Sequence, residues 1–365
     1  MRSSTRRLAW LVALLTAVGL VAAACGSSSD AGSADTTTAA AGGATSELDL
    51  EALSGTINGS GATFPAAFYE VAIDGFTEVA PGLTVNYNAV GSGQGKKDLA
   101  AGTSDWAGTD SLVKDDEKGQ FRGDILYFPT VAAPITVSYN LKGVDGLQLS
   151  PSTLAKIFTG SITSWDDPAI VAENEGVDLP SEGITVMVRS DGSGTTSNFS
   201  KFLKAAAPDD FSLEAGDTVA WPKATASKGN SGVAQAVKDT AGAIGYVDLS
   251  DSNALSLQQA AIRNKAGEYV TPTLEAASAA LAGAELKPDM TLSPLDAAGA
   301  EAYPITASTY VLVYSAPSGG KAQAIKGWLT YLLTDAQELA PEVDFAPLPP
   351  SVQVKVLAQI EKIQG

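Results

Sequence analysis

The chain of 365 residues contains no histidine. Without an imidazole it cannot use the Ser-His-Asp or Cys-His arrangements that activate nucleophiles, and it cannot bind zinc through histidine. The single cysteine, Cys25, excludes an intrachain disulfide and a cysteine-rich metal site. Basic residues are also few, because 23 Lys and Arg stand against 41 Asp and Glu and give a net charge of −18. Nucleic acid and anionic membrane surfaces repel such a protein, so we expect no nucleic-acid binding.

Residues 1–24 have the pattern of an export signal. Three arginines precede an apolar stretch that runs from residue 8 to residue 24, as in a secretory signal peptide. The stretch ends in small residues directly before Cys25, which resembles the lipobox of bacterial lipoproteins, although that pattern usually has Leu where this chain has Ala22. We expect cleavage before Cys25 and acylation of its thiol. The alternatives are an ordinary signal peptide that leaves a free Cys25, and an uncleaved anchor, which is disfavoured because about 17 apolar residues are short for a membrane span.

The segment 25–47 consists mainly of Gly, Ser, Ala and Thr. This composition cannot bury enough apolar surface to fold. We therefore expect a disordered tether that holds a soluble domain at the outer face of the cytoplasmic membrane. The folded part is expected to begin near Leu48.

From Leu48 onward, short β-rich runs alternate with segments that carry apolar residues at helical spacing. The expected strands lie at 55–58, 83–87, 125–128, 135–139, 184–188, 243–247 and 310–314. The expected helices lie at 66–79, 197–206, 233–239 and 322–333. Such alternation predicts an α/β fold, and the length predicts two domains at roughly 150 residues each.

Three Gly-Ser-Gly triplets, at 59–61, 91–93 and 192–194, each follow an expected strand and precede an expected helix. Glycine lets backbone N–H groups approach a ligand closely, and a helix N-terminus adds unpaired donors with partial positive charge. Three such turns together could bind one anion. Each triplet taken singly is also explained as an ordinary strand-to-helix turn.

Two of the triplets superficially resemble enzyme motifs. The loop 91–97 lacks the first Gly and the final Ser or Thr of a nucleotide-binding P-loop. Asp191 stands where a nucleophile elbow has Gly, and no histidine is available to activate Ser193. We therefore expect no enzyme: no catalytic residue, no cofactor and no metal.

The third triplet belongs to a more specific segment. Arg189 ends an expected strand, Asp191 follows two residues later, and Ser193 and Thr195 lie at the expected helix start. The planar guanidinium suits an oxyanion, and a neighbouring carboxylate can hold it in place. The alternative is a structural ion pair at a helix whose N-cap is Ser193.

Ten short motifs then occur in the order seen in the phosphate-binding protein of bacterial phosphate-specific ABC transporters, and the chain resembles that family over about residues 55–355. They are GSGATFP at 59–65, GSG at 91–93, SDWAGTD at 104–110, FPT at 128–130, SWDD at 164–167, RSDGSGT at 189–195, KGN at 228–230, GAIGYV at 242–247, YPIT at 303–306 and LPP at 348–350.

The resemblance implies a periplasmic-binding-protein fold of type II, in which two α/β lobes joined by a two-strand hinge hold the ligand in their cleft. The hinge crossings would fall near Pro129 and Tyr303. Lobe 1 would then comprise residues 48–130 plus 303–365, and lobe 2 residues 131–302.

Matching the family motifs position by position also implies a set of phosphate-binding residues. These are Ala62, Thr63, Phe64, Ser92, Asp110, Arg189, Ser193, Gly194 and Thr195, with Asp191 orienting Arg189. A carboxylate such as Asp110 can accept a hydrogen bond from the proton of hydrogen phosphate, whereas sulfate at neutral pH has no proton to donate. Asp110 would therefore favour phosphate and repel sulfate.

The implied function is an extracytoplasmic, lipid-anchored and monomeric receptor that captures inorganic phosphate and delivers it to the permease subunits of an ABC transporter. Another tetrahedral oxyanion, sulfate or molybdate, is an alternative that Asp110 argues against. A secreted phosphatase with Ser92 or Ser193 as nucleophile is disfavoured because histidine is absent. An adhesive surface lipoprotein is a third alternative.

Overall fold

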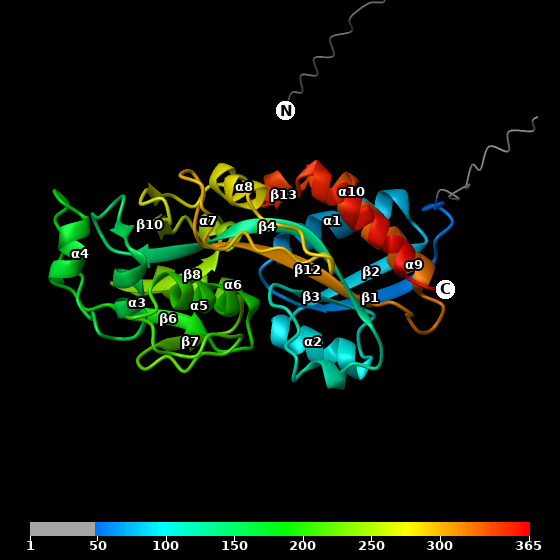
Figure 1. The fold of residues 1–365 in the computed structure, drawn as a ribbon, viewed down its shortest axis with the longest axis horizontal. Coiled ribbons are helices and arrows are strands. Elements are labelled where there is room, and N and C mark those ends of the chain that lie inside the picture. The colour runs from blue at the N-terminus through cyan, green and yellow to red at the C-terminus, as the bar shows by residue number, and fades with distance from the viewer. Residues whose placement is uncertain (1–47) are drawn as a thin grey trace, which may run out of the picture. The chain divides into compact units, whose positions relative to one another are not determined.

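Strand β4 (Ile125–Asn140) runs through the middle of the main sheet in the computed structural model, which describes residues 48–365 (Figure 1). The first part of β4 pairs antiparallel with β12 (Thr306–Tyr314), and its last part pairs antiparallel with β8 (Ala243–Asp248). The strand order in the sheet is β2-β1-β3-β12-β4-β8-β6-β7. β4 therefore joins the two ends of one sheet.

The expected signal peptide 1–24, the tether 25–47 and the acylated Cys25 lie outside the described residues. Within residues 48–365, no helix has the length and apolar content needed to cross a membrane.

One end of the sheet is built from strands and helices of both chain termini. Its elements are β1 (Gly55–Gly61), α1 (Ala66–Val79), β2 (Leu83–Ala89), α2 (Ser92–Ala101), β3 (Trp106–Thr109), α9 (Ala322–Leu333), β13 (Ala346–Pro347) and α10 (Pro350–Gln359). β1 pairs in parallel with β2 and β3, and β3 pairs antiparallel with β12. In Figure 1, α9 and α10 lie above these strands and α2 lies below them.

The other end of the sheet is built from the middle of the chain. Its elements are β5 (Gln148–Leu149), α3 (Pro151–Phe158), α4 (Pro168–Glu173), β6 (Thr185–Arg189), α5 (Gly194–Ala206), β7 (Thr225–Ser227), α6 (Gly229–Asp239), α7 (Leu249–Ala254), β9 (Gln258–Gln259), β10 (Ala261–Arg263), β11 (Tyr269–Val270) and α8 (Leu274–Ala282). β6 pairs in parallel with β7 and β8, while β11, β10 and β5 form a small separate sheet. Short 3₁₀ helices occupy Lys118–Gln120, Asp335–Glu338, Ala340–Val343 and Ile360–Lys362.

The runs at 125–128 and 135–139 are β-strand as expected, but they are parts of the single strand β4 and not two separate strands. Pro129 and Pro134 lie between them, and proline ordinarily interrupts a central strand because it lacks the backbone N–H. Here the strand continues because residues on both sides of each proline pair with neighbouring strands. The pairing with β12 is irregular only between Ser308 and Tyr310.

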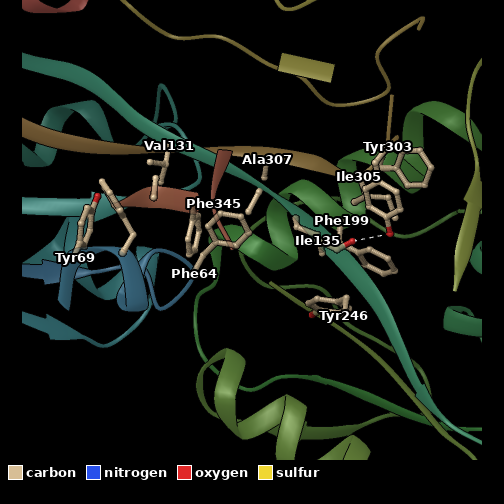
Figure 2. Packing of buried hydrophobic residues seen from close by; sticks show 14 of the residues in the cluster. Phe64, Tyr69, Val131, Ile135, Phe199, Tyr246, Tyr303, Ile305, Ala307 and Phe345 are labelled. Atoms are coloured by element: carbon tan, nitrogen blue, oxygen red, sulfur yellow. Dashed lines mark hydrogen bonds between the residues drawn. The ribbon is translucent and has the colours of Figure 1, made fainter. Parts of the chain in front are cut away.

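A continuous apolar core extends through both ends of the sheet. Figure 2 shows Phe64 and Phe345 packed at one end, Phe199 and Tyr246 at the other, and side chains of β4 and β12 between them. The rings of Phe199 and Tyr246 are stacked with centroids 4.5 Å apart. The core thus fixes the positions of the turns that lead from the strands into α1, α2 and α5.

Candidate functional site

The three Gly-Ser-Gly triplets meet in the structure. Gly91 N donates a hydrogen bond to Gly61 O (2.7 Å), which joins the first two triplets. Gly93 N donates to Gly192 O (2.9 Å), which joins the second to the third. Gly61 and Gly91 have φ values of 144° and 97°, a region that favours glycine. The triplets therefore bring the N-termini of α2 and α5 together.

Asp110 follows β3 and is only 4% exposed. Its Oδ1 accepts a hydrogen bond from Thr309 Oγ1 (2.7 Å), and its Oδ2 accepts from Ser92 Oγ (3.4 Å). Burial is the largest influence on its pKa and raises it to about 7, although Thr309, Arg189 and Ser92 each lower it in part. A Cβ on Gly194 would lie 2.7 Å from Asp110 Oδ2, so the start of α5 lies directly against this carboxyl group.

Arg189 ends β6, and its guanidinium is almost completely buried. Nε donates to Asp191 Oδ1 (2.9 Å), and Nη2 donates to the other oxygen of the same carboxylate. Nη1 donates to Asn230 Oδ1 (3.3 Å) and lies 3.5 Å from Thr195 Oγ1. Burial alone would raise the pKa of Asp191, but the hydrogen bond and charge of Arg189, with the N–H of Gly229, outweigh it and hold the pKa below its usual value. Both oxygens of Asp191 thus accept hydrogen bonds from the Arg189 guanidinium.

Ser193 is the N-cap of α5, because its Oγ accepts a hydrogen bond from Thr196 N (3.1 Å). This capping and the Arg189–Asp191 pair are common to both interpretations of the segment, the ligand site and the structural ion pair. The N–H groups of Gly194 and Thr195 belong to the first turn of α5, where a helix has no internal acceptors for them.

The first triplet leads to Ala62, Thr63 and Phe64. Ala62 N donates to Gly108 O (2.8 Å), so this N–H already has a partner. By contrast, within residues 48–365 the N–H groups of Thr63 and Phe64 form no hydrogen bond. Thr63 Oγ1 accepts from Asn230 N (3.2 Å), which places it next to the residues around Arg189.

Asn230 was not among the expected site residues. It is fully buried, contacts Arg189, and its Nδ2 also donates to Thr195 Oγ1 (3.2 Å). The only sequence signal for it was the KGN motif at 228–230, to which no role was attached.

Together, the expected residues form one polar site with a cation, a buried carboxyl group and several unpaired donors. Within residues 48–365, no group of three or more His, Cys, Asp or Glu side chains could hold a metal ion. With Arg189 as a charged donor and Asp110 as an acceptor, the site can form hydrogen bonds to an anion.

A family model described as a PBP superfamily domain matches residues 28–336, so the chain is a member of that superfamily. A solved structure of a phosphate-binding protein from Stenotrophomonas maltophilia has the same fold, with a TM-score of 0.66 at 21% identity, over 83% of this chain and 93% of that one. The expected α/β periplasmic-binding-protein fold is thus confirmed.

Curated relatives identify the family within this superfamily. The phosphate-binding protein PstS of Pasteurella multocida is 32% identical over 320 residues, which cover 86% of this chain and 92% of that protein. Phosphate-binding protein PstS 2 of Mycobacterium tuberculosis is 33% identical over 369 residues, covering 96% and 97% respectively. Within the superfamily, the chain belongs to the PstS family of phosphate-binding proteins, and the resemblance noted in the sequence is confirmed.

Proposed function

We propose that the protein captures inorganic phosphate outside the cytoplasm and delivers it to the permease subunits of a phosphate ABC transporter. The observation that carries this proposal is that a fixed cation, Arg189, and a fixed acceptor, Asp110, are both buried at one site, beside N–H groups that have no hydrogen-bond partner within residues 48–365. Relatives named as phosphate-binding proteins over nearly the whole chain support it. They are binding proteins, in agreement with a role that involves no catalysis and no cofactor.

The proposed donors to phosphate are backbone and side-chain groups of three turns. They are the N–H groups of Thr63, Phe64, Gly194 and Thr195, the hydroxyl groups of Thr63, Ser193 and Thr195, and the guanidinium of Arg189. Ser92 would donate to phosphate only in place of its 3.4 Å hydrogen bond to Asp110 Oδ2, and Ala62 contributes only backbone position. Thr195 Oγ1 accepts from Asn230 and Arg189, and Thr63 Oγ1 accepts from Asn230. A hydroxyl group that already accepts has its proton free to donate. Both threonines are therefore oriented as donors.

Asp110 is the proposed acceptor for the proton of hydrogen phosphate. Its two oxygens receive only hydroxyl donors from the protein, Thr309 and Ser92, so they retain lone pairs for the ligand. Sulfate would place an oxygen without a proton against this carboxylate, which favours phosphate over sulfate.

We further propose the division into lobe 1 (residues 48–130 plus 303–365) and lobe 2 (residues 131–302), with phosphate closing the cleft between them. Two hydrogen bonds that support a closed form join residues of different lobes, Gly93 N to Gly192 O and Asn230 N to Thr63 Oγ1. Ligand shifts such an equilibrium because each lobe supplies some of its contacts.

The monomeric state and the lipid anchor at Cys25 also belong to this proposal. An alkyne-labelled fatty acid fed to cells should become attached to the wild-type protein and not to Cys25→Ser. Equal labelling of the two proteins would contradict acylation at this position.

Calorimetric titration of the purified, phosphate-stripped protein tests the function. We expect one-to-one binding of phosphate, much weaker binding of sulfate and molybdate, and no hydrolysis of a chromogenic phosphate ester. Arg189→Met should weaken phosphate binding by at least a hundredfold, because a buried charge-assisted donor is lost. Arg263→Met removes the same charge from an exposed position at the end of β10 and is the control. Absence of phosphate binding by the wild type, or equal binding by both variants, would contradict the proposal.

A further inference from the structure

A group of polar and charged side chains, here called the Asp217 cluster, lies beside the proposed phosphate site. It consists of Lys96, Ser111 and Asp217, which are largely buried, and Glu117, which is 30% exposed. Asp217 belongs to the segment between α5 and β7, and its carbonyl oxygen accepts a hydrogen bond from Ser193 N (2.9 Å). Its Oδ2 accepts from Ser111 Oγ (2.9 Å) and lies 3.0 Å from Lys96 Nζ. Lys96 is in α2, one turn after Ser92. One carboxylate oxygen thus joins the proposed lobe 2 to lobe 1 at two points.

The pair formed by Lys96 and Asp217 is shielded from solvent. Only 4% of the Lys96 side chain and 12% of the Asp217 side chain are exposed. The other carboxylate oxygen of Asp217, Oδ1, is buried and has no hydrogen-bond partner in the part of the chain described, 48–365. Asp217 therefore depends on Lys96 and Ser111 for its stabilisation, and salt screens a buried pair of this kind only weakly.

Each of the two charges also has a counter-charge on its own lobe. Glu117 Oε2 lies 3.0 Å from Lys96 Nζ and remains with it when the lobes separate. Lys201 lies on α5; burial lowers its pKa, and the charge of Asp217 opposes that effect, so Lys201 is a longer-range counter-charge for Asp217 rather than an ion-pair partner. Opening the cleft therefore leaves Lys96 paired with Glu117 and gives Asp217 access to solvent. Because the lysine keeps a partner, the pair of Lys96 and Asp217 can break and re-form reversibly.

We propose that Lys96 and Asp217 are positioning residues that raise the affinity for phosphate by stabilising the closed form without contacting the ligand. This inference depends on the proposed function and on the proposed division into two lobes. If only the closed form binds the ligand fully, the apparent Kd equals the intrinsic Kd divided by the fraction of ligand-free protein that is in the closed form. Loss of the pair should therefore weaken binding mainly through faster dissociation.

The decisive variant is Asp217→Asn, which keeps the shape and the acceptor for Ser111 but removes the charge. We expect the Kd for phosphate to rise about ten- to a hundredfold, the effect of losing a charged hydrogen bond. Lys96→Met should have a similar effect, and the double variant should be little weaker than either single variant, because both changes break one interaction. Asp115→Asn is the matched control, since Asp115 pairs with Lys118 in full solvent, with side chains 96% and 65% exposed.

The measurements are the phosphate Kd, the stopped-flow dissociation rate, and the radius of gyration without ligand and with saturating phosphate. Asp217→Asn should remain more expanded than the wild type when ligand is subsaturating and should release phosphate faster, while its urea unfolding without ligand stays near that of the wild type. Binding within twofold of the wild type, or single effects that simply add in the double variant, would overturn the inference. Should Asp217→Asn fail to fold, Lys96→Met and Ser111→Ala decide the outcome. Failure of the wild type and of Asp115→Asn to bind phosphate would instead refute the proposed function.

Discussion

The protonation of Asp110 should control sulfate binding. Burial is the largest cause that raises the pKa of this carboxyl group, to about 7. Sulfate near neutral pH has no proton to donate, so it can bind beside Asp110 only when the carboxyl group itself carries the proton. We therefore predict that sulfate affinity falls as the pH rises through 7.

The size of the effect follows from the protonated fraction. With a pKa of about 7, about nine-tenths of the Asp110 carboxyl groups are protonated at pH 6 and about one-tenth at pH 8. The Kd for sulfate should therefore rise about tenfold between these two pH values. The background is favourable because the chain contains no histidine, the side chain that ordinarily titrates here. Burial also raises the pKa values of Asp248 and Asp251, so a variant of Asp110 is needed to assign the effect.

The assay is calorimetric titration of the phosphate-free protein with sulfate at pH 6, 7 and 8 at constant ionic strength. In Asp110→Asn, the amide can donate to sulfate at every pH, so the profile should be flat, and sulfate should bind more tightly than to the wild type at pH 8. A constant wild-type Kd across the range would refute the reasoning. So would a tenfold dependence that survives in Asp110→Asn.

Two substitutions outside the proposed ligand contacts give further predictions. Thr309→Val removes the donor to Asp110 Oδ1. This change should raise the pKa of Asp110 by about one unit and strengthen sulfate binding at pH 8 about fivefold. Ser308→Ala is the control: it removes a neighbouring hydroxyl that has no partner in the described chain, and it should leave the Kd for sulfate unchanged. Gly95→Ala would place a Cβ 2.4 Å from a backbone atom of β1, so the free energy of unfolding in urea should fall by about 1–3 kcal/mol. Gly119→Ala meets no atom within 4 Å and should change it by less than about 0.5 kcal/mol; equal effects of the two alanines would contradict the packing argument.

Local signals in the sequence were sufficient to predict the helices that carry the site. The helix expected at 66–79 is α1, and the helix expected at 197–206 is α5, which begins slightly earlier at Gly194. Apolar spacing and the capping group of Ser193 act within a few residues, so a pattern can reveal them. Trp106 and Trp165, which lie in the motifs at 104–110 and 164–167, are both fully buried.

The contacts that tune the site could not be predicted in this way. Thr309 bonds to Asp110 from 199 positions away, and Asn230 bonds to Arg189 from 41 positions away. No local pattern encodes which distant strand or helix supplies such a partner, because the pairing is decided by how β12 and α6 pack. For the same reason the sequence did not reveal that β4 is continuous. Its prolines favour a break in the strand, but pairing with the neighbouring strands prevents one.

The hydrogen bond between Gly93 N and Gly192 O has a consequence for how affinity can evolve. Both partners are main-chain atoms, so replacing one side chain by another cannot change the strength of this hydrogen bond in small steps. A Cβ on Gly93 would lie 3.2 Å from Gly192 Cα, so substitution there tends to push the two turns apart. Selection can therefore keep or lose this contact but cannot adjust it. Adjustment of affinity to scarce or plentiful phosphate must come from side chains, and the pair of Lys96 and Asp217 is one that single substitutions can change in steps.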